Sequence, residues 1–320
     1  MDPFSQATIG AAAAQSVIKK ADLARIGLIG ALAGMAPDLD VLIQSSTDPL
    51  LQLEYHRQFT HSLVFIPFGA LLCAIAFWPF VRRHMSFKAI WLTALAGYAT
   101  HGLLDACTTY GTLLLWPFSD ARIAWNTISV VDPLFTLPLL GIVIAAGVKK
   151  SQFIGRLGMA WVAFYLSIGV IQEERALAAG EALAAQRGHA TAVVSAKPSF
   201  GNLLLWKTVY EHDDEFWVDA VRAGGSVTII EGDHVERLDL TAAFPWLDPN
   251  SQQVLRTFGM FFSPGATMYL LADCTELNLA DVSDALGALR RRNLVQRTDD
   301  KQYILHDLTF SYVRSLAPDS

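Results

Sequence analysis

One stretch of this 320-residue chain limits its possible folds more than any other feature. Leu63 to Val81 contains nineteen residues and no Lys, Arg, Asp or Glu. As an α-helix rising about 1.5 Å per residue it would be about 28 Å long, close to the thickness of a bilayer's hydrocarbon layer. Core helices of soluble proteins seldom run this far without a charge. The run therefore predicts a membrane-spanning helix, and a buried helix of a soluble α protein is the less favoured alternative.

Weaker apolar stretches accompany this run. Two near the N-terminus are short and rich in small residues, and the spacing Gly30-xxx-Gly34 offers a surface on which another helix can pack closely. Together with the run they predict an all-α polytopic integral membrane domain of about four to six membrane helices over residues 1–171. The weaker stretches cover residues 4–18, 23–36, 89–107, 131–148 and 153–171.

The composition changes after Ile171. The whole chain is 52% hydrophobic and 17% charged, yet residues 1–171 carry a net charge of +2 and residues 172–320 carry −8. An Ala/Glu-rich helical stretch is followed by strand-like runs and two helices, which predicts a small soluble α+β domain over residues 172–320. These elements are expected at residues 173–187, 203–211, 215–222, 226–231, 251–261 and 279–293.

Lysine and arginine gather in three connections between the predicted spans. Basic connections prefer the cytoplasm, and these three are separated by an even number of crossings, so one orientation satisfies all of them. We therefore expect a multi-pass membrane protein whose C-terminal domain is extracytoplasmic. The basic residues are Lys19, Lys20, Arg25, Arg82, Arg83, Lys88, Lys149, Lys150 and Arg156.

Four short stretches place polar or ionisable side chains where an apolar helix bundle has little use for them. Charges at the membrane edge are costly and usually mark function. In the expected orientation these stretches follow or precede the outer ends of neighbouring spans, so they converge on one face. They are Pro37-Asp38-Leu39-Asp40, His56-Arg57-Gln58-Phe59-Thr60-His61-Ser62, His101-Gly102-Leu103-Leu104-Asp105 and Thr108-Thr109-Tyr110-Gly111.

The histidines and carboxylates of these stretches suggest a divalent metal ion. His101 and Asp105 are four residues apart, so they share a helix face and can point at one ion, although such a pair is often a structural ion pair. His56 and His61 fit a helix-entry loop and the first turn after it. With Asp38 and Asp40 included, the set exceeds what one tetrahedral zinc needs. We expect one or two ions, Zn²⁺ before Mn²⁺, with surplus groups acting as general base or orienting residues.

Asp38, Asp40 and Arg57 are the residues that we also expect to act in catalysis. One aspartate would ligate the metal and the other would face the bound water, with Asp40 preferred as the ligand because it lies closer in sequence to His56. Asp40 or Asp105 would be the base if it does not ligate. Arg57 is expected to bind an anionic group of the substrate, the alternative being an arginine that extends to the membrane interface.

At these residues the chain resembles the YdjM-like membrane-bound metal-dependent hydrolases. The resemblance spans about residues 6–120, and its HRxxTHS and HxxxDxxTxYG pieces are specific. It implies an inner-membrane hydrolase, and the region around Leu205-Trp206-Lys207 is similar to that of longer members with an appended extracytoplasmic domain. Many relatives carry a histidine near the N-terminus, where this chain has Gln6 and Thr8. The metal ligands that the resemblance implies are Asp38, Asp40, His56, His61, His101 and Asp105.

Two classes of function compete. In the first, a metal-activated water attacks an ester or phosphoester of a membrane lipid or lipid-linked substrate at the outer face. The alternative is a non-catalytic metal carrier or sensor, which would need ionisable residues through the depth of the bundle, whereas the inner halves of the predicted spans hold almost none. Nucleic acid is not expected as a partner, because no stripe of Lys and Arg is present. A less favoured reading takes residues 280–305 as a helix and β-wing of a winged-helix DNA-binding domain.

Overall fold

The computed structural model describes residues 1–19, 22–43, 55–213, 215–236, 247–261, 268–275, 277–291, 295–297 and 303–305. The chain forms two compact units. The first comprises Met1–Asp40 and His56–Arg237, and the second comprises Val41–Tyr55 and Leu238–Ser320. The first unit is mostly helical and ends in a small antiparallel sheet.

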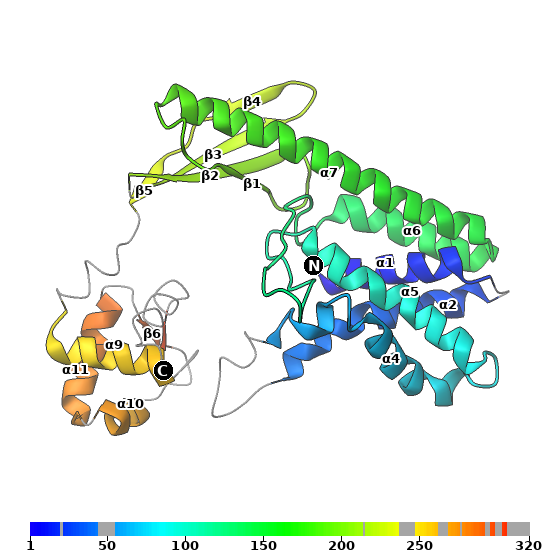
Figure 1. Ribbon diagram of the computed structural model, residues 1–320, viewed down its shortest axis with the longest axis horizontal. Coiled ribbons are helices and arrows are strands. Elements are labelled where there is room, and N and C mark those ends of the chain that lie inside the picture. Colours follow the sequence, from blue (N-terminus) through cyan, green and yellow to red (C-terminus); the bar gives the residue numbers. More distant parts are fainter. Residues whose placement is uncertain are drawn as a thin grey trace. The chain divides into compact units, whose positions relative to one another are not determined.

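The helices of the first unit form three hairpins (Figure 1). Asp2, Asp22, Ser86 and Asp132 begin four of these helices, because each side chain accepts hydrogen bonds from backbone N–H groups of the first turn. The turns of all three hairpins lie at the same end of the bundle and carry the basic residues noted above, of which Lys20 lies outside the described residues. The pairs are α1 (Pro3–Val17) with α2 (Leu23–Met35), α4 (Ile66–Val81) with α5 (Phe87–Ala106), and α6 (Pro133–Lys149) with α7 (Gln152–Gln186).

Glycine residues let α1, α2 and α5 approach one another closely. A Cβ atom placed on Gly30 would lie 2.5 Å from the carbonyl oxygen of Gly10, and one placed on Gly97 would overlap the backbone of Gly30. A Cβ on Gly34 would lie 2.7 Å from the carbonyl oxygen of Gln6. Backbone-to-backbone packing of this kind is the usual way for membrane helices to associate. The expected role of the Gly30-xxx-Gly34 surface is therefore confirmed.

The outer face of the bundle is apolar, while its interior contacts are made by small residues. α7 is the one helix in the described part of the chain that is long and apolar enough to cross a membrane by itself, and α4 and α6 are apolar but shorter. The expected number of four to six membrane helices therefore remains a prediction. Exposed apolar side chains include Leu28, Leu32, Phe68, Leu72, Leu137, Ile144, Val148, Phe153 and Phe164.

The sheet of the first unit packs against the C-terminal half of α7. All its strand pairs are antiparallel, in the order β1-β2-β3-β4 with β5 beside β3. Trp206 of β2 is fully buried, lies opposite Val221 of β3, and shares a core with Ala176 of α7. The strands are β1 (Ser195–Pro198), β2 (Leu205–His212), β3 (Glu215–Ala223), β4 (Val227–Ile230) and β5 (His234–Glu236).

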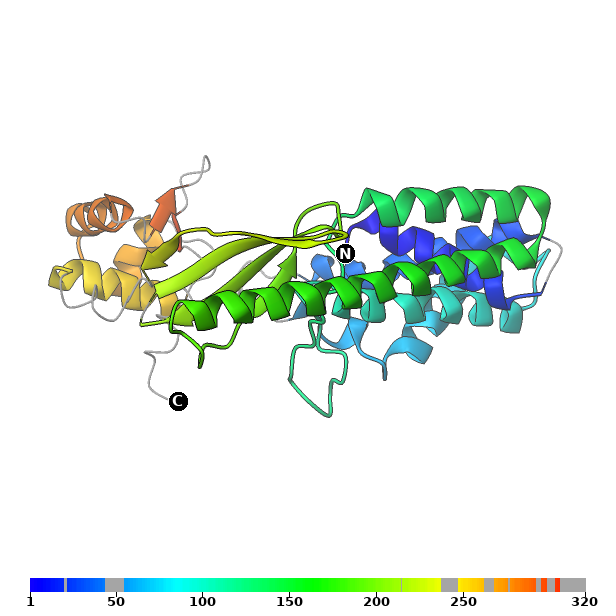
Figure 2. The same cartoon turned by 90° about the horizontal axis from the view of Figure 1, so that it is seen from above.

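α7 is continuous across residue 171, where the sequence placed the domain boundary. Figure 2 shows this helix lying along both the bundle and the sheet. Residues 173–186 are rich in Ala and Glu, which favour helix, and contain no proline, so the helix continues after the apolar segment ends. Arg187, just past the helix, makes two hydrogen bonds to Asp219 of β3, of 2.8 and 2.9 Å. A single rigid helix thus joins the bundle to the sheet.

The second unit is a small helical domain with a hairpin. Leu286 and Leu289 of α11 are fully buried in its core, with Leu271 of α10 and Val254 of α9. A helix followed by a two-stranded antiparallel hairpin is the order that the winged-helix reading expects, although the turn at residues 299–300 lies outside the described residues. The elements are α9 (Pro249–Phe261), α10 (Met268–Thr275), α11 (Leu279–Arg291), β6 (Val295–Arg297) and β7 (Tyr303–Leu305).

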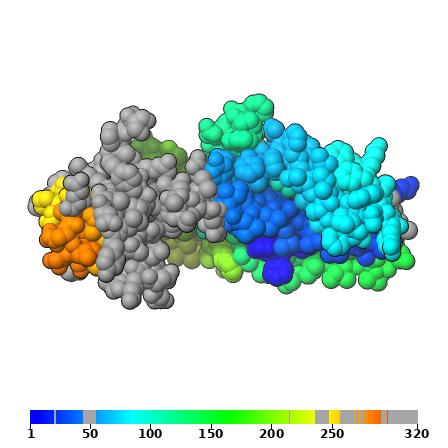
Figure 3. All heavy atoms as spheres, turned by 90° about the horizontal axis from the view of Figure 1, so that it is seen from below, coloured from blue at the N-terminus to red at the C-terminus, as the bar shows by residue number. Residues whose placement is uncertain are grey.

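The connection between α5 and α6 projects from the first unit. In the space-filling view of Figure 3 it is the teal-green segment that stands out beyond α4 and α5. Its base is held by an antiparallel bridge between Thr112 and Ile123, with backbone N–H···O distances of 3.0 and 2.9 Å. The connection begins where α5 ends, at the opposite end of the bundle from the basic turns.

The glycine contacts predict a difference in stability between two substitutions in helices. Gly97→Ala should lower the thermal midpoint of the detergent-purified protein, because the new methyl group meets the Gly30 backbone, and such overpacking costs about 1–3 kcal/mol. Gly141→Ala is the control, since a Cβ at Gly141 has no neighbour within 4 Å and the gain in helix propensity is similar. Equal midpoints for the two variants would refute the proposed contact.

Candidate metal centre

Three segments that are far apart in sequence each contribute to one cluster in the first unit. The 3₁₀ helix η1 (Ala36–Leu42) carries Asp38, the 3₁₀ helix η2 (Phe59–His61) carries His61, and the end of α5 carries His101 and Asp105. One donor atom from each of these four residues lies within 4.8 Å of the others, so the group could hold a metal ion. Three of the side chains are buried, and that of Asp38 is 26% exposed. The cluster is therefore accessible from the side of Asp38.

α5 also positions the segment that carries His61. The Tyr98 hydroxyl donates a hydrogen bond of 2.9 Å to the backbone carbonyl of Thr60, and Gly102 lets the His61 backbone lie directly against α5. On the other side, the N–H groups of Leu63 and Leu113 form backbone hydrogen bonds across to Leu114 and Arg57. η2 is thus held between α5 and the start of the projecting connection.

The distances within the cluster match those expected between ligands of a single small cation. Nε2 of His101 lies 3.2 Å from Asp38 Oδ1 and 3.8 Å from Asp105 Oδ2. Nε2 of His61 lies 3.5 and 3.4 Å from the same two oxygens, and the two Nε2 atoms are 2.9 Å apart. A tetrahedral zinc site with bonds of about 2.0–2.1 Å has edges of about 3.3–3.4 Å. The four donors therefore already have roughly tetrahedral spacing.

The hydrogen bonds of His101 leave its Nε2 atom available as a ligand. Nδ1 lies 2.6 Å from the backbone carbonyl oxygen of Gly34, which can only accept a hydrogen bond. Nδ1 therefore carries the hydrogen, and in the neutral imidazole Nε2 presents a lone pair toward the cluster. Backbone carbonyls orient metal-binding histidines in this way in many proteins.

His61 is oriented in the same sense through Thr60. The Thr60 hydroxyl donates its hydrogen to Asp40 Oδ2 at 2.8 Å, so its oxygen accepts from Nδ1 of His61 at 2.9 Å. Asp40 Oδ2 itself lies 3.4 Å from the same nitrogen. In the neutral ring, the Nε2 atom of His61 would therefore also present a lone pair, and it faces Nε2 of His101 at 2.9 Å.

Two lone pairs and two carboxylates facing one another need a positive charge between them. Asp105 Oδ2 is buried and has no hydrogen-bond partner among the described residues. A proton can meet part of this need: burial opposes the imidazolium form of His61, but the carboxylates of Asp105, Asp38 and Asp40, each 3.4–3.5 Å from its ring nitrogens, outweigh burial and raise the pKa of His61 to about 10. A divalent cation meets the need more fully, because it satisfies all four donors at once.

Asp40 and His56 lie beside the cluster rather than in it. Asp40 Oδ1 is 2.8 Å from Nδ1 of His56, and its Oδ2 accepts from the backbone N–H of Arg57 at 3.0 Å as well as from Thr60. Burial disfavours the charged form, but the hydrogen bonds from His56 and His61 hold the pKa of Asp40 well below its usual range. The sequence favoured Asp40 as the ligand, whereas the geometry favours Asp38 and gives Asp40 the role of organising residues 56–61.

Asp105 has a second set of contacts that the sequence did not predict. Its Oδ1 atom accepts a hydrogen bond of 2.9 Å from the Gln6 side chain and contacts the amino group of Met1. Gln6 is fully buried in α1. The sequence does show a glutamine side chain at position 6 among the Ala and Gly residues of this helix. It could not indicate that Asp105 is the hydrogen-bond partner of Gln6.

Arg57 extends toward the cluster from a left-handed backbone conformation, with φ of 63°. Its Nε lies 3.4 Å from Asp105 Oδ2, and its guanidinium carbon lies 5.6 Å from the centre of the Tyr110 ring. The backbone conformation is held by hydrogen bonds to Asp40 and Thr112. Non-glycine residues adopt this conformation rarely, and it often accompanies a functional role. Arg57 can therefore reach both Asp105 and a molecule bound at the cluster.

Comparison with known proteins agrees with the helices and polar stretches described above. Residues 1–176 match the family model described as YdjM inner membrane protein. The chain is 37% identical over 114 residues to the inner membrane protein YbcI of Escherichia coli K12, covering 33% of this chain and 62% of YbcI. It is 30% identical over 112 residues to the uncharacterized protein YfhP of Bacillus subtilis, covering 35% of this chain and 34% of YfhP. No solved structure matches the chain significantly.

The family model covers more than half of the chain, including all four residues of the cluster. The resemblance derived from the sequence motifs is therefore confirmed, and the names of the family and of YbcI indicate an inner membrane protein. This chain belongs to the YdjM inner membrane protein family.

Proposed function

We propose that the protein is a metal-dependent hydrolase that cleaves an ester or phosphoester of a lipid or lipid-linked substrate at the membrane surface. The observation that carries this proposal is the convergence of two histidine Nε2 lone pairs and two carboxylate oxygens on one point. An ordinary structural ion pair needs one donor and one acceptor, whereas this group, with both imidazoles neutral, has four acceptors facing inward. Oδ2 of Asp105 is buried and accepts no hydrogen bond within the described part of the chain; its neighbours, Arg57 Nε and His61 Nε2, lie at 3.4 Å, which supports its binding of a cation.

Asp38, His61, His101 and Asp105 would hold the ion, and their chemistry suits Zn²⁺ or Mn²⁺. Two neutral imidazoles and two carboxylates balance the charge of one divalent cation. The convergence of all four donors favours one ion over two. When bound, such an ion would lower the pKa of a coordinated water toward neutrality.

The other residues have separate roles in this proposal. Asp38 is the most exposed member of the cluster, so it lies where water and substrate enter. Asp40 keeps His61 and the backbone of Arg57 in place, since its oxygens are already occupied by His56, Arg57 and Thr60. Arg57 holds an anionic group of the substrate next to the cluster. We therefore assign acceptance of the water's proton to Asp38, through the carboxylate oxygen that does not face the histidines, and positioning to Asp40.

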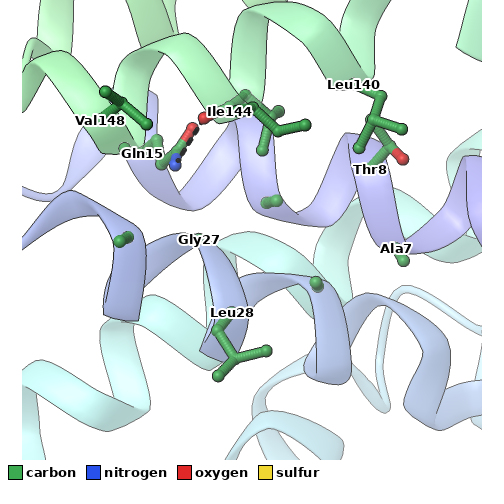
Figure 4. A pocket seen from close by; sticks show the side chains of 13 residues that line it. Ala7, Thr8, Gln15, Gly27, Leu28, Leu140, Ile144 and Val148 are labelled. Atoms are coloured by element: carbon green, nitrogen blue, oxygen red, sulfur yellow. Dashed lines mark hydrogen bonds between the residues drawn. The ribbon is translucent and has the colours of Figure 1, made fainter. Parts of the chain in front are cut away.

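A lipid substrate is supported by an apolar groove between helices of the first unit. The groove has a volume of about 350 Å³ and lies between α2 and α6, over small residues of α1 (Figure 4). Ala7 and Thr8 line one end, and Gln15 and Val148 line the other, which is about 12 Å further along α1. None of the four cluster residues lines the groove. Gln6, which precedes the lining residue Ala7 in the sequence, donates a hydrogen bond to Asp105. An alkyl chain in this groove would lie along α1, from Ala7 toward Gln15.

The position of the ionisable residues supports an enzyme over a carrier. A carrier needs ligands along a path through the bundle. Within the described part of the helices, the metal-binding group lies at one end of the bundle. Between that end and the basic turns, the contacts between helices are made largely by Gly and Ala. The basic turns lie at the opposite end, which supports a site on the outer face and an extracytoplasmic C-terminal domain.

The ligand assignment predicts the metal content of three variants. His101→Ala and Asp105→Ala should each lower metal affinity on the order of 10²-fold or more, because each loses a bond and exposes the ion to water. His84→Ala is the matched control, since His84 is exposed at the far end of the bundle. The measurement is the number of ions per chain in detergent-purified protein after dialysis. Full occupancy in His101→Ala would make the group a structural ion-pair cluster.

The division of roles between the aspartates predicts different defects. Asp38→Asn should lose bound metal, whereas Asp40→Asn should retain metal and lose about 10–100-fold in turnover, because it only orients its neighbours. Both variants and the wild type are to be assayed on a panel of lipid phosphoesters and carboxylic esters, with metal content measured in parallel. If the wild type carries metal and turns over no member of the panel, the carrier or sensor reading replaces the hydrolase.

The orientation predicts the behaviour of two fusions. A reporter active only outside the cytoplasm should be active after Ser320 and inactive in the turn at residues 82–88. A reporter that fluoresces only in the cytoplasm should give the reverse pattern. Cytoplasmic placement of the C-terminus would overturn the orientation, move the site to the inner face, and favour the winged-helix reading of the second unit.

A further inference from the structure

The connection between α5 and α6 brings a second arginine next to Arg57. Through the bridge between Thr112 and Ile123, residue 122 lies across from the start of the connection. Nη1 of Arg122 and Nη1 of Arg57 each lie 3.4 Å from the same acceptor, the backbone carbonyl oxygen of Gly111. This pairing could not be predicted from the sequence, because the two arginines are 65 positions apart and only one belongs to a recognisable motif.

Gly111 makes the convergence possible. Its φ is 63°, and a Cβ atom at this position would lie 2.5 Å from the carbonyl oxygen of Ile123. The backbone can therefore turn tightly here and direct one carbonyl toward both guanidinium groups. Because both guanidinium groups face this carbonyl, they lie close together; desolvation, and then the positive charge of Arg57, lower the pKa of Arg122.

This pair of cations has little negative charge of its own. Arg122 has no carboxylate within 4.0 Å in the described ranges. Arg57 has one carboxylate neighbour in those ranges, Asp105, whose Oδ2 lies 3.4 Å from Arg57 Nε. Asp105 belongs to the metal-binding group, so its charge would be shared with the ion. The contacts to Gly111 are long for hydrogen bonds, and each guanidinium has five N–H groups. Most of these donors are therefore available to a ligand.

We propose that Arg57 and Arg122 together bind the phosphate group of the substrate, which makes the substrate a phosphoester rather than a carboxylic ester. This inference rests on the proposed function for the identity of the bound molecule. Two guanidinium groups offer paired donors that match the oxygens of a phosphate, whereas a neutral ester would bring no negative charge to either of them. Arg57 reaches the cluster side of the phosphate and Arg122 reaches its solvent side, since Arg122 is exposed.

The test is the binding of inorganic phosphate and of short-chain phosphatidic acid to the full chain in detergent, measured by calorimetry. Arg122→Gln should weaken both ligands at least 10-fold with no change in metal content, and Arg122→Lys should weaken them less. Arg57→Gln should act in the same direction. Arg83→Gln is the control, because Arg83 is exposed at the opposite end of the bundle.

The two ligands distinguish the sources of the phosphate group. Tighter binding of phosphatidic acid than of inorganic phosphate supports a lipid phosphate, and equal binding supports a soluble one; both outcomes retain the arginine pair. Unchanged phosphate binding in Arg122→Gln, or an equal loss in Arg83→Gln, would overturn the inference. If Arg122→Gln loses phosphate binding while the wild type hydrolyses nothing, the hydrolase proposal fails and the phosphate site stands.

Discussion

The hydrogen bond from His101 Nδ1 to the carbonyl of Gly34 connects the packing of the helices to the chemistry of the cluster. At 2.6 Å it is possible only because α2 and α5 approach each other without side chains between them. Gly34 packs against Gly10 and Gly97 at this crossing. The same contact therefore closes the interface between helices and sets which nitrogen of His101 faces the cluster. Loosening the crossing would change both.

The cluster concentrates negative charge in a place that has little water. Buried carboxylates are costly unless they are paired, and here each one is assigned a partner. Both oxygens of Asp40 have hydrogen-bond partners, which are His56, Thr60 and the backbone N–H of Arg57. Asp105 receives Gln6 on one oxygen, whereas its other oxygen accepts no hydrogen bond among the described residues and lies 3.4 Å from both Arg57 Nε and His61 Nε2. This asymmetry distinguishes the carboxylates that support the site from those that can bind an ion.

The sequence predicted the helices well, because long apolar runs and glycine spacing report directly on membrane packing. It also identified the residue types at the site, since charged side chains at the ends of apolar helices stand out. It could not rank Asp38 above Asp40. In a 3₁₀ helix each residue is rotated about 120° from the one before it, so the side chains of Asp38 and Asp40 point in different directions. Only the fold shows which of them faces the histidines. The spacing Asp-x-Asp is the same in either case.

Two further features depend on tertiary structure that leaves no local pattern. Arg122 reaches Arg57 through a bridge within the projecting connection, and no spacing in the sequence anticipates that bridge. The continuity of α7 across residue 171 was missed for the opposite reason. The change in composition there is real, but it marks a change of surroundings along one helix rather than the end of the helix.

X-ray absorption spectroscopy of the zinc-loaded protein tests the metal centre most directly. The structure predicts one ion per chain, with scattering from two imidazole rings and oxygen ligands at about 2.0–2.2 Å and no sulfur. His61→Ala and His101→Ala should each remove one imidazole contribution. A spectrum without histidine scattering, or one unchanged in both variants, would contradict the assignment of these two Nε2 atoms as metal ligands.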